Sequence, residues 1–186
     1  MQHGLPEQAI EPTASRAGAN KLGYRAVKRA FDLTATAMAV IVLSPLFLIL
    51  SVIVYLGDPG AVIYGQVRIG KNGKPFKMWK FRSMYRNADQ MIDQLNVLAG
   101  EMSLVGPRPL LKSEIQQYYA DSADVLLSVK PGVTGYWQAY ARNNATYQSG
   151  HRQQMEMTYI RQASIWLDCK ILMKTVVAVL RRDGAK

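Results

Sequence analysis

The sequence predicts an α+β, mostly helical protein, in which a re-entrant membrane helix hairpin precedes a small cytoplasmic domain with a short β-hairpin and amphipathic helices. Three observations predict it: a long apolar run broken by a proline, basic residues on both sides of that run, and two short alternating segments after it. At 186 residues with 49% hydrophobic residues, the chain can form one globular core. We expect a disordered tail over 1–22, the hairpin over 23–57 and the domain over 58–186.

The apolar run FDLTATAMAVIVLSPLFLILSVIVYL extends from Phe31 to Leu56, and Asp32 is its single charged residue. Its length exceeds the roughly 20 residues that cross a bilayer. Proline removes a helical hydrogen bond and clashes with the preceding turn, so we expect a sharp bend at Ser44 and Pro45. Each arm is then too short to span the bilayer. This favours a hairpin that enters and leaves the membrane on the same side. A spanning helix and a buried core helix are the alternatives.

The formal charge of +10 is concentrated on both sides of the apolar run. A spanning helix usually carries the Lys and Arg excess on its cytoplasmic side only, so both ends of the hairpin are expected to be cytoplasmic. Such flanks suit anionic lipid, nucleotide phosphate or nucleic acid, and the apolar run argues against nucleic acid. The flanking cations are Arg16, Lys21, Arg25, Lys28, Arg29, Arg68, Lys71, Lys74, Lys77, Lys80 and Arg82.

The remaining patterns predict the elements of the domain. AVIYGQV and PFKMWKF read as a β-hairpin, for which Asn72-Gly73 supplies a tight turn or part of a longer connection. Helices are expected over 86–98 and 111–127, the second ending before Lys-Pro-Gly. Another helix begins near Ser149, and apolar spacing indicates a C-terminal helix or helix pair over 160–180.

Four basic side chains could contact a phosphorylated ligand. Arg108 lies between two prolines in Gly-Pro-Arg-Pro, which presets a guanidinium whose planar fork fits phosphate oxygens, although a rigid turn tied to a structural carboxylate is equally compatible. Arg142 lies in the polar stretch AYARNNATY, a predicted loop. Lys80 and Arg82 would point to one side of a strand and form a positive patch for lipid phosphate, nucleotide phosphate or solubility.

Several classes of site are excluded by what the sequence lacks. His3 and His151 are far apart and give no histidine pair for a metal, and no Ser/His/Asp arrangement is evident. The single cysteine, Cys169, excludes an internal disulfide and a cysteine-based zinc cluster. Glycine-rich phosphate loops of the dinucleotide or Walker kind are absent as well.

The motifs KRAFDL, LSPLFL, KFRSMY, GEMSLVGPRPL, KPGVTGYWQ and SIWLDCKILMKTV occur in this order, and together they resemble the bacterial sugar transferases, the monotopic polyprenyl-phosphate phosphoglycosyl transferases of the exopolysaccharide type. The resemblance covers nearly everything after Lys28. It implies transfer of a sugar 1-phosphate from a UDP-sugar to undecaprenyl phosphate, which initiates exopolysaccharide or glycan repeat-unit synthesis. It also implies Mg²⁺ as cofactor, the cytoplasmic face of the bacterial inner membrane, and a homo-oligomer or other polysaccharide-assembly proteins as partners.

By this resemblance, Lys80, Arg108 and Arg142 match positions that bind the substrate phosphates, and Glu156 is a further substrate contact. The family's catalytic Asp-Glu pair, a nucleophile and a magnesium ligand, lies in a DELPQ-like stretch before NVL. Here that place reads NADQMIDQLNVLAGEMSL, so several tens of residues are missing near 86–96 and the pair has gone with them. The catalytic and metal-binding residues therefore have no assignment.

Three carboxylates lie near the shortened stretch: Asp89, Asp93 and Glu101. Asp93-Gln94 cannot replace the pair, because glutamine offers magnesium no charge. The loss supports an alternative function, in which the chain is an inactive, truncated paralogue that binds the membrane or lipid phosphate, or pairs with a full-length transferase.

Overall fold

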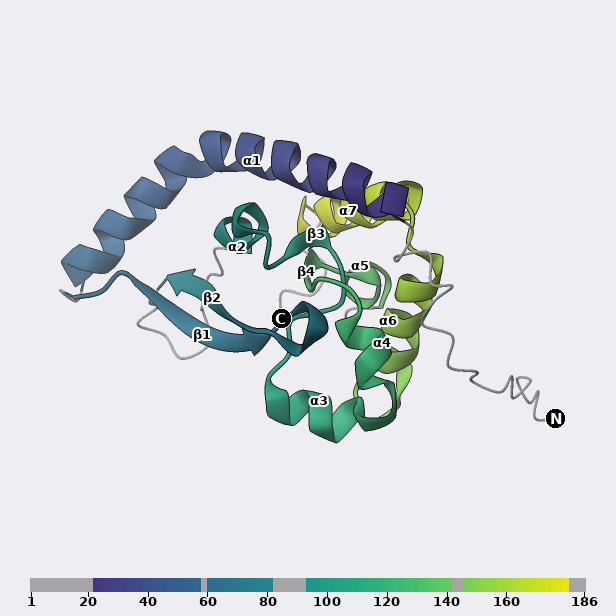
Figure 1. Ribbon diagram of the computed structural model, residues 1–186. Helices are drawn as coiled ribbons and strands as arrows, with labels where there is room; N and C mark the ends of the chain where they lie inside the picture. The colour runs from purple at the N-terminus through teal and green to yellow at the C-terminus, as the bar shows by residue number, and fades with distance from the viewer. Residues whose placement is uncertain (1–21, 58–59, 82–92, 142–145, 181–186) are drawn as a thin grey trace.

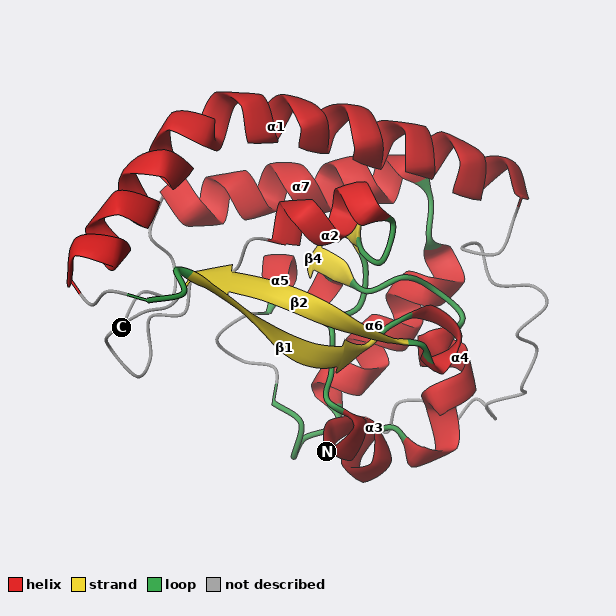
Figure 2. Ribbon diagram, turned by 60° about the vertical axis from the view of Figure 1, so that its left-hand side comes forward, coloured by secondary structure: helices red, strands yellow, loops and turns green. Residues whose placement is uncertain are grey.

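The computed structural model describes residues 22–57, 60–81, 93–141 and 146–180. Its long first helix, α1, arches over a layer of short helices and two small sheets (Figures 1 and 2), and it contacts α2 and α7. The elements are α1 (Leu22–Gly57), β1 (Ile63–Ile69), η3 (Lys71–Gly73), β2 (Pro75–Phe81), α2 (Asp93–Ala99), β3 (Ser103–Val105), α3 (Lys112–Tyr118), η4 (Ala120–Ser122), α4 (Ala123–Leu127), β4 (Gly132–Thr134), α5 (Tyr136–Tyr140), α6 (His151–Gln162) and α7 (Ile165–Leu180).

Helix α1 continues through Pro45 and bends along its length (Figure 1). A proline has no N–H, so the carbonyl of Ile41, four residues earlier, loses its helical donor. The hydroxyl of Ser44 donates to this carbonyl at 2.8 Å and so replaces the missing bond inside the apolar segment. The sequence predicts two arms that turn back, whereas the structure has one bent helix. Return of the chain to the side it entered stays a prediction.

The second half of α1 presents its apolar side chains to the outside. Met38, Ile41, Val42 and Leu48 are each at least two-thirds exposed. Among the described residues, α1 is the one helix long and apolar enough to cross a membrane. This exposure argues against the buried core helix of a soluble protein, because such a helix would be covered on all faces.

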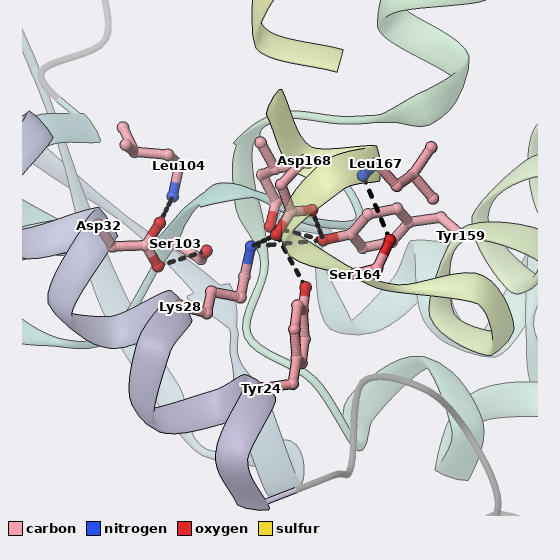
Figure 3. Close-up of polar contacts among 10 residues, drawn as sticks. Tyr24, Lys28, Asp32, Ser103, Leu104, Tyr159, Ser164, Leu167 and Asp168 are labelled. Atoms are coloured by element: carbon pink, nitrogen blue, oxygen red, sulfur yellow. Dashed lines mark hydrogen bonds and ion pairs between the residues drawn. The ribbon is translucent and has the colours of Figure 1, made fainter. Parts of the chain in front are cut away.

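The first half of α1 is tied to the domain by a buried carboxylate (Figure 3). Asp168 of α7 accepts hydrogen bonds from the hydroxyl of Tyr24 at 2.8 Å, from Nζ of Lys28 at 2.7 Å and from the hydroxyl of Tyr159 at 2.8 Å. Asp168 is 1% exposed, and a buried charge is stable only with partners. The Lys28 ion pair and two hydroxyl donors provide them. The start of α1 is thereby fixed against the last helix of the described chain.

One turn further along, Asp32 and Arg29 attach α1 to the centre of the domain. Asp32 accepts from the hydroxyl of Ser103 at 2.6 Å and from the N–H of Leu104 at 3.2 Å, both in β3. The guanidinium of Arg29 donates to two carbonyls in the last turn of α2, at 2.6 and 3.0 Å. The one acidic residue of the apolar run is therefore a buried structural group (Figure 3).

The predicted β-hairpin is confirmed. β1 and β2 pair antiparallel from Ile63 opposite Phe81 to Ile69 opposite Pro75. The connection is longer than a two-residue turn and contains η3, in which Asn72 (φ 57°) and Gly73 (φ 72°) take left-handed backbone conformations.

Two predicted helices differ from the structure. The helix expected over 111–127 is interrupted, because Tyr119 leaves the helical region (φ −133°, ψ 18°) and its buried ring turns inward, so α3, η4 and α4 replace it. Of the helix expected over 86–98, the structure describes α2, and residues 86–92 lie outside the described chain. The helix expected to begin near Ser149 is present as α6, and the C-terminal element expected over 160–180 is present mainly as the single helix α7.

The sequence did not predict the parallel pair of β3 and β4, which lies at the centre of the domain. Ser103 pairs with Gly132 and Val105 with Thr134. The main core surrounds this pair and includes Val105, Leu110, Ile115, Tyr119, Leu126, Tyr159, Ile160, Ala163 and Ile171. A smaller cluster under the hairpin contains Phe76, Met78, Val97 and Met102.

Replacement of Ser44 by alanine is expected to lower the free energy of unfolding in lipid nanodiscs by about 1 kcal/mol, because the Ile41 carbonyl then has no donor in the hydrocarbon. Ser51→Ala is the matched control. Its hydroxyl donates to the Phe47 carbonyl at 2.7 Å, and this carbonyl keeps its helical N–H donor. Chemical denaturation of both variants tests this, and equal losses would contradict the role given to Ser44.

Candidate functional site

The loop that carries Arg108 follows β3 and is pressed against the segment before and within β4. The N–H of Gly132 donates to the carbonyl of Pro107 at 2.8 Å, and the N–H of Gly106 donates to Thr134 at 2.9 Å. A Cβ on Gly106 would lie 2.6 Å from a backbone oxygen, and one on Gly132 would lie 2.1 Å from a backbone nitrogen. Only glycine fits at these two positions, and the close backbone contact fixes where the loop starts.

The buried carboxylate of Glu156, on α6, anchors the same loop through a hydrogen bond. Its Oε1 accepts the N–H of Arg108 at 3.1 Å and the indole N–H of Trp137 at 3.2 Å. Its Oε2 accepts the hydroxyl of Tyr119. Glu156 is 1% exposed and both oxygens are used, so in this structure it positions the backbone of Arg108. Its predicted contact with substrate stays a prediction.

Burial raises the pKa of Glu156, and the hydrogen bonds from Tyr119, Arg108 and Trp137 oppose that rise. Burial and the neighbouring carboxylate also raise the pKa of Tyr119, which keeps its hydroxyl protonated and able to donate. The guanidinium of Arg152 lies 4.0 Å from the centre of the Trp137 ring and 4.8 Å from that of Tyr147. These contacts fix the rings of Trp137 and Tyr147 beside the Glu156 carboxylate.

The side chain of Arg108 is half-buried, and its guanidinium makes no hydrogen bond to the described residues. The sequence left two interpretations of this arginine open: a preset phosphate ligand, or a turn tied to a structural carboxylate. In the structure, the carboxylate of Glu156 binds the backbone of Arg108 rather than its side chain. Within the described part of the chain, the guanidinium is therefore positioned by its backbone and its donors are open to a ligand.

The other predicted site residues are not joined to Arg108 by the described contacts. Lys80 lies in β2 on the inward face that it shares with Phe76 and Met78, and it is 8% exposed. Arg142 lies outside the described residues, as does Arg82. Whether Lys80 and Arg142 bind substrate phosphate stays a prediction.

The structure gives no support to a magnesium site among the residues it describes. No group of three or more His, Cys, Asp and Glu side chains lies close enough there to hold a metal ion. Glu101 is exposed and accepts a hydrogen bond from Asn96 at 2.6 Å. Asp89 and the side chain of Asp93 lie outside the described residues. Magnesium binding by this chain therefore stays a prediction.

Sequence reasoning missed the groups that support the site. Tyr119 and Trp137 read as core aromatics, and nothing in their local pattern indicates a shared carboxylate. The network around Asp168 was missed for the same reason, although the polar residues Lys28 and Asp32 close to an apolar run were a signal. Charged groups so near hydrocarbon require buried partners.

The sequence profile of the family described as bacterial sugar transferase matches residues 23–94 and 89–182. The two stretches meet where KFRSMY leads towards NVL, which is the place where the sequence is shorter than the family pattern.

Several curated relatives match most of the chain. The undecaprenyl-phosphate galactose phosphotransferase of Salmonella typhimurium is 35% identical over 207 residues, covering 89% of this chain and 43% of the relative. The exopolysaccharide production protein ExoY of Rhizobium meliloti is 33% identical, covering 85% of this chain and 87% of the relative. The UDP-glucose:undecaprenyl-phosphate glucose-1-phosphate transferase of Escherichia coli is 32% identical, covering 94% and 43%.

The chain spans less than half the length of the first and third of these relatives. The alignment with the Salmonella typhimurium protein has 207 positions, more than the 186 residues of this chain. Within the matched region, that relative therefore has residues with no counterpart in this chain.

Replacement of Glu156 by alanine is expected to lower the free energy of unfolding by about 3 kcal/mol, because two buried N–H donors lose their acceptor. Glu156→Gln is the matched control, since its amide oxygen can keep both bonds while its amide nitrogen faces the Tyr119 oxygen. Denaturant titration of both variants measures the difference. An alanine variant as stable as the glutamine variant would contradict the anchoring role.

The same pair of proteins tests the raised pKa. Between the ordinary value of 4.5 and the higher folded pKa, the folded protein keeps the Glu156 proton while the unfolded chain loses it. The stability of the wild type should therefore fall as the pH rises through this interval, relative to Glu156→Gln. A difference in unfolding free energy that is independent of pH from 4.5 upward would contradict a raised pKa.

Proposed function

Because the chain belongs to the bacterial sugar transferase family, we propose that it transfers a sugar 1-phosphate from a UDP-sugar to undecaprenyl phosphate at the cytoplasmic face of the bacterial inner membrane. In the net reaction, a phosphate oxygen of the lipid becomes bonded to the sugar-bearing phosphorus of the donor. The bond from that phosphorus to the UMP oxygen breaks, and UMP leaves with the electron pair. The product is a lipid diphosphate sugar, the first unit of an exopolysaccharide or glycan repeat.

The observation that carries this proposal is the position of Arg108. Its backbone is fixed by the buried Glu156 and by the glycine contacts with β4, while its guanidinium keeps its donors. A guanidinium that is held in place and can donate two parallel hydrogen bonds suits the two negative phosphates of a sugar nucleotide. It also stabilises the charge that develops as UMP leaves. The loop follows β3 directly, and β3 is bonded to Asp32 of the membrane helix. This arrangement supports a position of the arginine close to the lipid surface.

In this proposal the roles are divided among the chain's own residues. Arg108 binds the donor diphosphate, and Lys80 and Arg142 add positive charge around it. Glu156 orients Arg108 through its backbone. Mg²⁺ would neutralise phosphate charge when it is bound. The nucleophile has no assignment, and Asp89, Asp93 and Glu101 are the carboxylates to test.

A second function is favoured by the shortened stretch at residues 86–96. A chain without the Asp-Glu pair would be a non-catalytic module that keeps the membrane helix and the phosphate-binding loop. It would then bind lipid phosphate, or pair with a full-length transferase. The apolar exposed half of α1 suits both forms equally.

An activity assay separates the two functions. Membranes that contain the chain, incubated with UDP-galactose or UDP-glucose, Mg²⁺ and undecaprenyl phosphate, are expected to release UMP. Arg108→Ala should lower the rate by about 100-fold, because one preorganised charge donor is lost. Lys112→Ala, an exposed cation of α3, is the control and should leave the rate unchanged.

The absence of UMP release beside an active full-length relative would contradict the transferase and support the binding module. If the chain is active, Asp89→Asn, Asp93→Asn and Glu101→Gln identify the nucleophile, since only the variant of the attacking carboxylate should abolish the reaction.

The membrane arrangement has its own test. Single cysteines at Arg25 and Lys74, in a Cys169→Ser background, mark the start of α1 and the β1–β2 connection, and both positions are exposed. A membrane-impermeant maleimide is expected to label both in inverted vesicles and neither in intact spheroplasts, because the bend at Ser44 and Pro45 returns the chain to one side. Labelling of the two positions from opposite sides would show that α1 spans the bilayer.

A further inference from the structure

A cavity of about 400 Å³ lies beside the start of α1, apart from the Arg108 loop. Figure 3 shows part of its wall, where Tyr24, Lys28 and Asp32 of α1 face Ser103 and Tyr159. The wall also carries cations from three separate parts of the chain. They are Arg25, Lys28 and Arg29 on α1, Lys71 in η3, and Lys130 before β4.

Two of these cations are already used by the fold. Lys28 forms the ion pair with Asp168, and Arg29 donates to the carbonyls of α2. The other three, Arg25, Lys71 and Lys130, form no ion pair within the described part of the chain. Asp32 is the one acidic residue in the wall, and its two oxygens already accept hydrogen bonds from β3. The cavity therefore has an excess of positive charge.

The cations are close enough to repel each other. A Cβ placed on Gly100 would lie 3.1 Å from Nη2 of Arg29 and 3.6 Å from Nζ of Lys130, so these two charges meet at one point. Burial lowers the pKa of Lys130, and the positive charge of Arg29 lowers it further. Burial and the positive charge of Arg25 lower the pKa of Lys71 in the same way. These like charges converge on a partly buried cavity that has no free carboxylate. A bound anion would reduce the repulsion between them.

The rest of the wall indicates what kind of anion fits. Leu22, Ala26, Val105 and Val129 give the cavity an apolar side. It lies at the start of α1, the helix whose later turns carry the exposed apolar side chains. Nζ of Lys28 lies 5.7 Å from the centre of the Tyr24 ring, and Tyr159 is buried, so neither ring offers an open stacking surface for a nucleobase. A phosphate attached to an apolar chain matches this lining better than a nucleotide does.

We propose that this cavity binds the phosphate headgroup of an anionic lipid, held by Arg25, Lys71 and Lys130 while its chain follows the apolar surface of α1. The phosphate can come from a prenyl phosphate or from an anionic phospholipid. This site is separate from the donor site at Arg108. It does not require catalysis, so an inactive chain would bind the lipid as well, and a failed activity assay would leave this inference standing.

The test measures ligand binding to the full chain in a neutral detergent, without sugar nucleotide. Thermal unfolding is followed while one probe is titrated: farnesyl phosphate, dioctanoyl phosphatidylglycerol, dioctanoyl phosphatidylcholine or inorganic phosphate. The first two are expected to raise the midpoint of unfolding in a saturable way. Stabilisation by both supports a general anionic headgroup site, and stabilisation by farnesyl phosphate alone supports a prenyl phosphate site. Equal stabilisation by phosphatidylcholine or by inorganic phosphate would overturn the proposal.

Charge variants locate the binding. Lys71→Gln with Lys130→Gln is expected to raise the apparent Kd for farnesyl phosphate by about 30-fold, from two lost charges. Lys74→Gln with Lys112→Gln removes the same charge from exposed positions outside the cavity and should change the Kd by less than about 3-fold. Because Lys71 and Lys130 lie among like charges, their double variant should be at least as heat-stable as the wild type without ligand. Unchanged binding by it, or an equal loss in the control pair, would overturn the proposal.

Discussion

The buried carboxylate of Asp168 is the group on which the arrangement of α1 and the rest of the domain depends. Two hydroxyls and one ammonium converge on it, and two of these three donors come from the first turns of α1. A buried charge is tolerated only when its partners are complete, so loss of Lys28 would leave an uncompensated carboxylate in the core. The helix that carries the apolar surface is therefore joined to the last helix by a bond that the domain cannot easily release.

This attachment continues from α1 to the site. Asp32 binds β3, and β3 leads directly into the loop of Arg108, while Arg29 binds the end of α2. From the other side, Glu156 binds the backbone of Arg108. The arginine thus lies between two buried carboxylates that belong to different parts of the fold. Its position relative to the apolar surface of α1 is set by these short contacts.

The sequence predicted those features whose causes are local. The Asn72-Gly73 connection acts on its own neighbours, so the β-hairpin could be predicted from the sequence. Pro45 also acts locally, but the structure has one bent helix there rather than two arms that turn back. The parallel pair of β3 and β4 was not predictable, because each strand has three residues and is shorter than the alternation that identifies a strand. The partners of Glu156 could not be identified either, since Tyr119 is 37 residues away from it and the contact depends on the complete fold.

The bond between Lys28 and Asp168 joins positions 140 residues apart. A ribosome adds about 5–20 residues per second, so α1 leaves the exit tunnel roughly ten seconds before its carboxylate partner is made. During that interval its start carries cations that the domain does not yet neutralise. Closure of the domain onto the start of α1 is consequently a late event of biosynthesis, because it waits for Asp168.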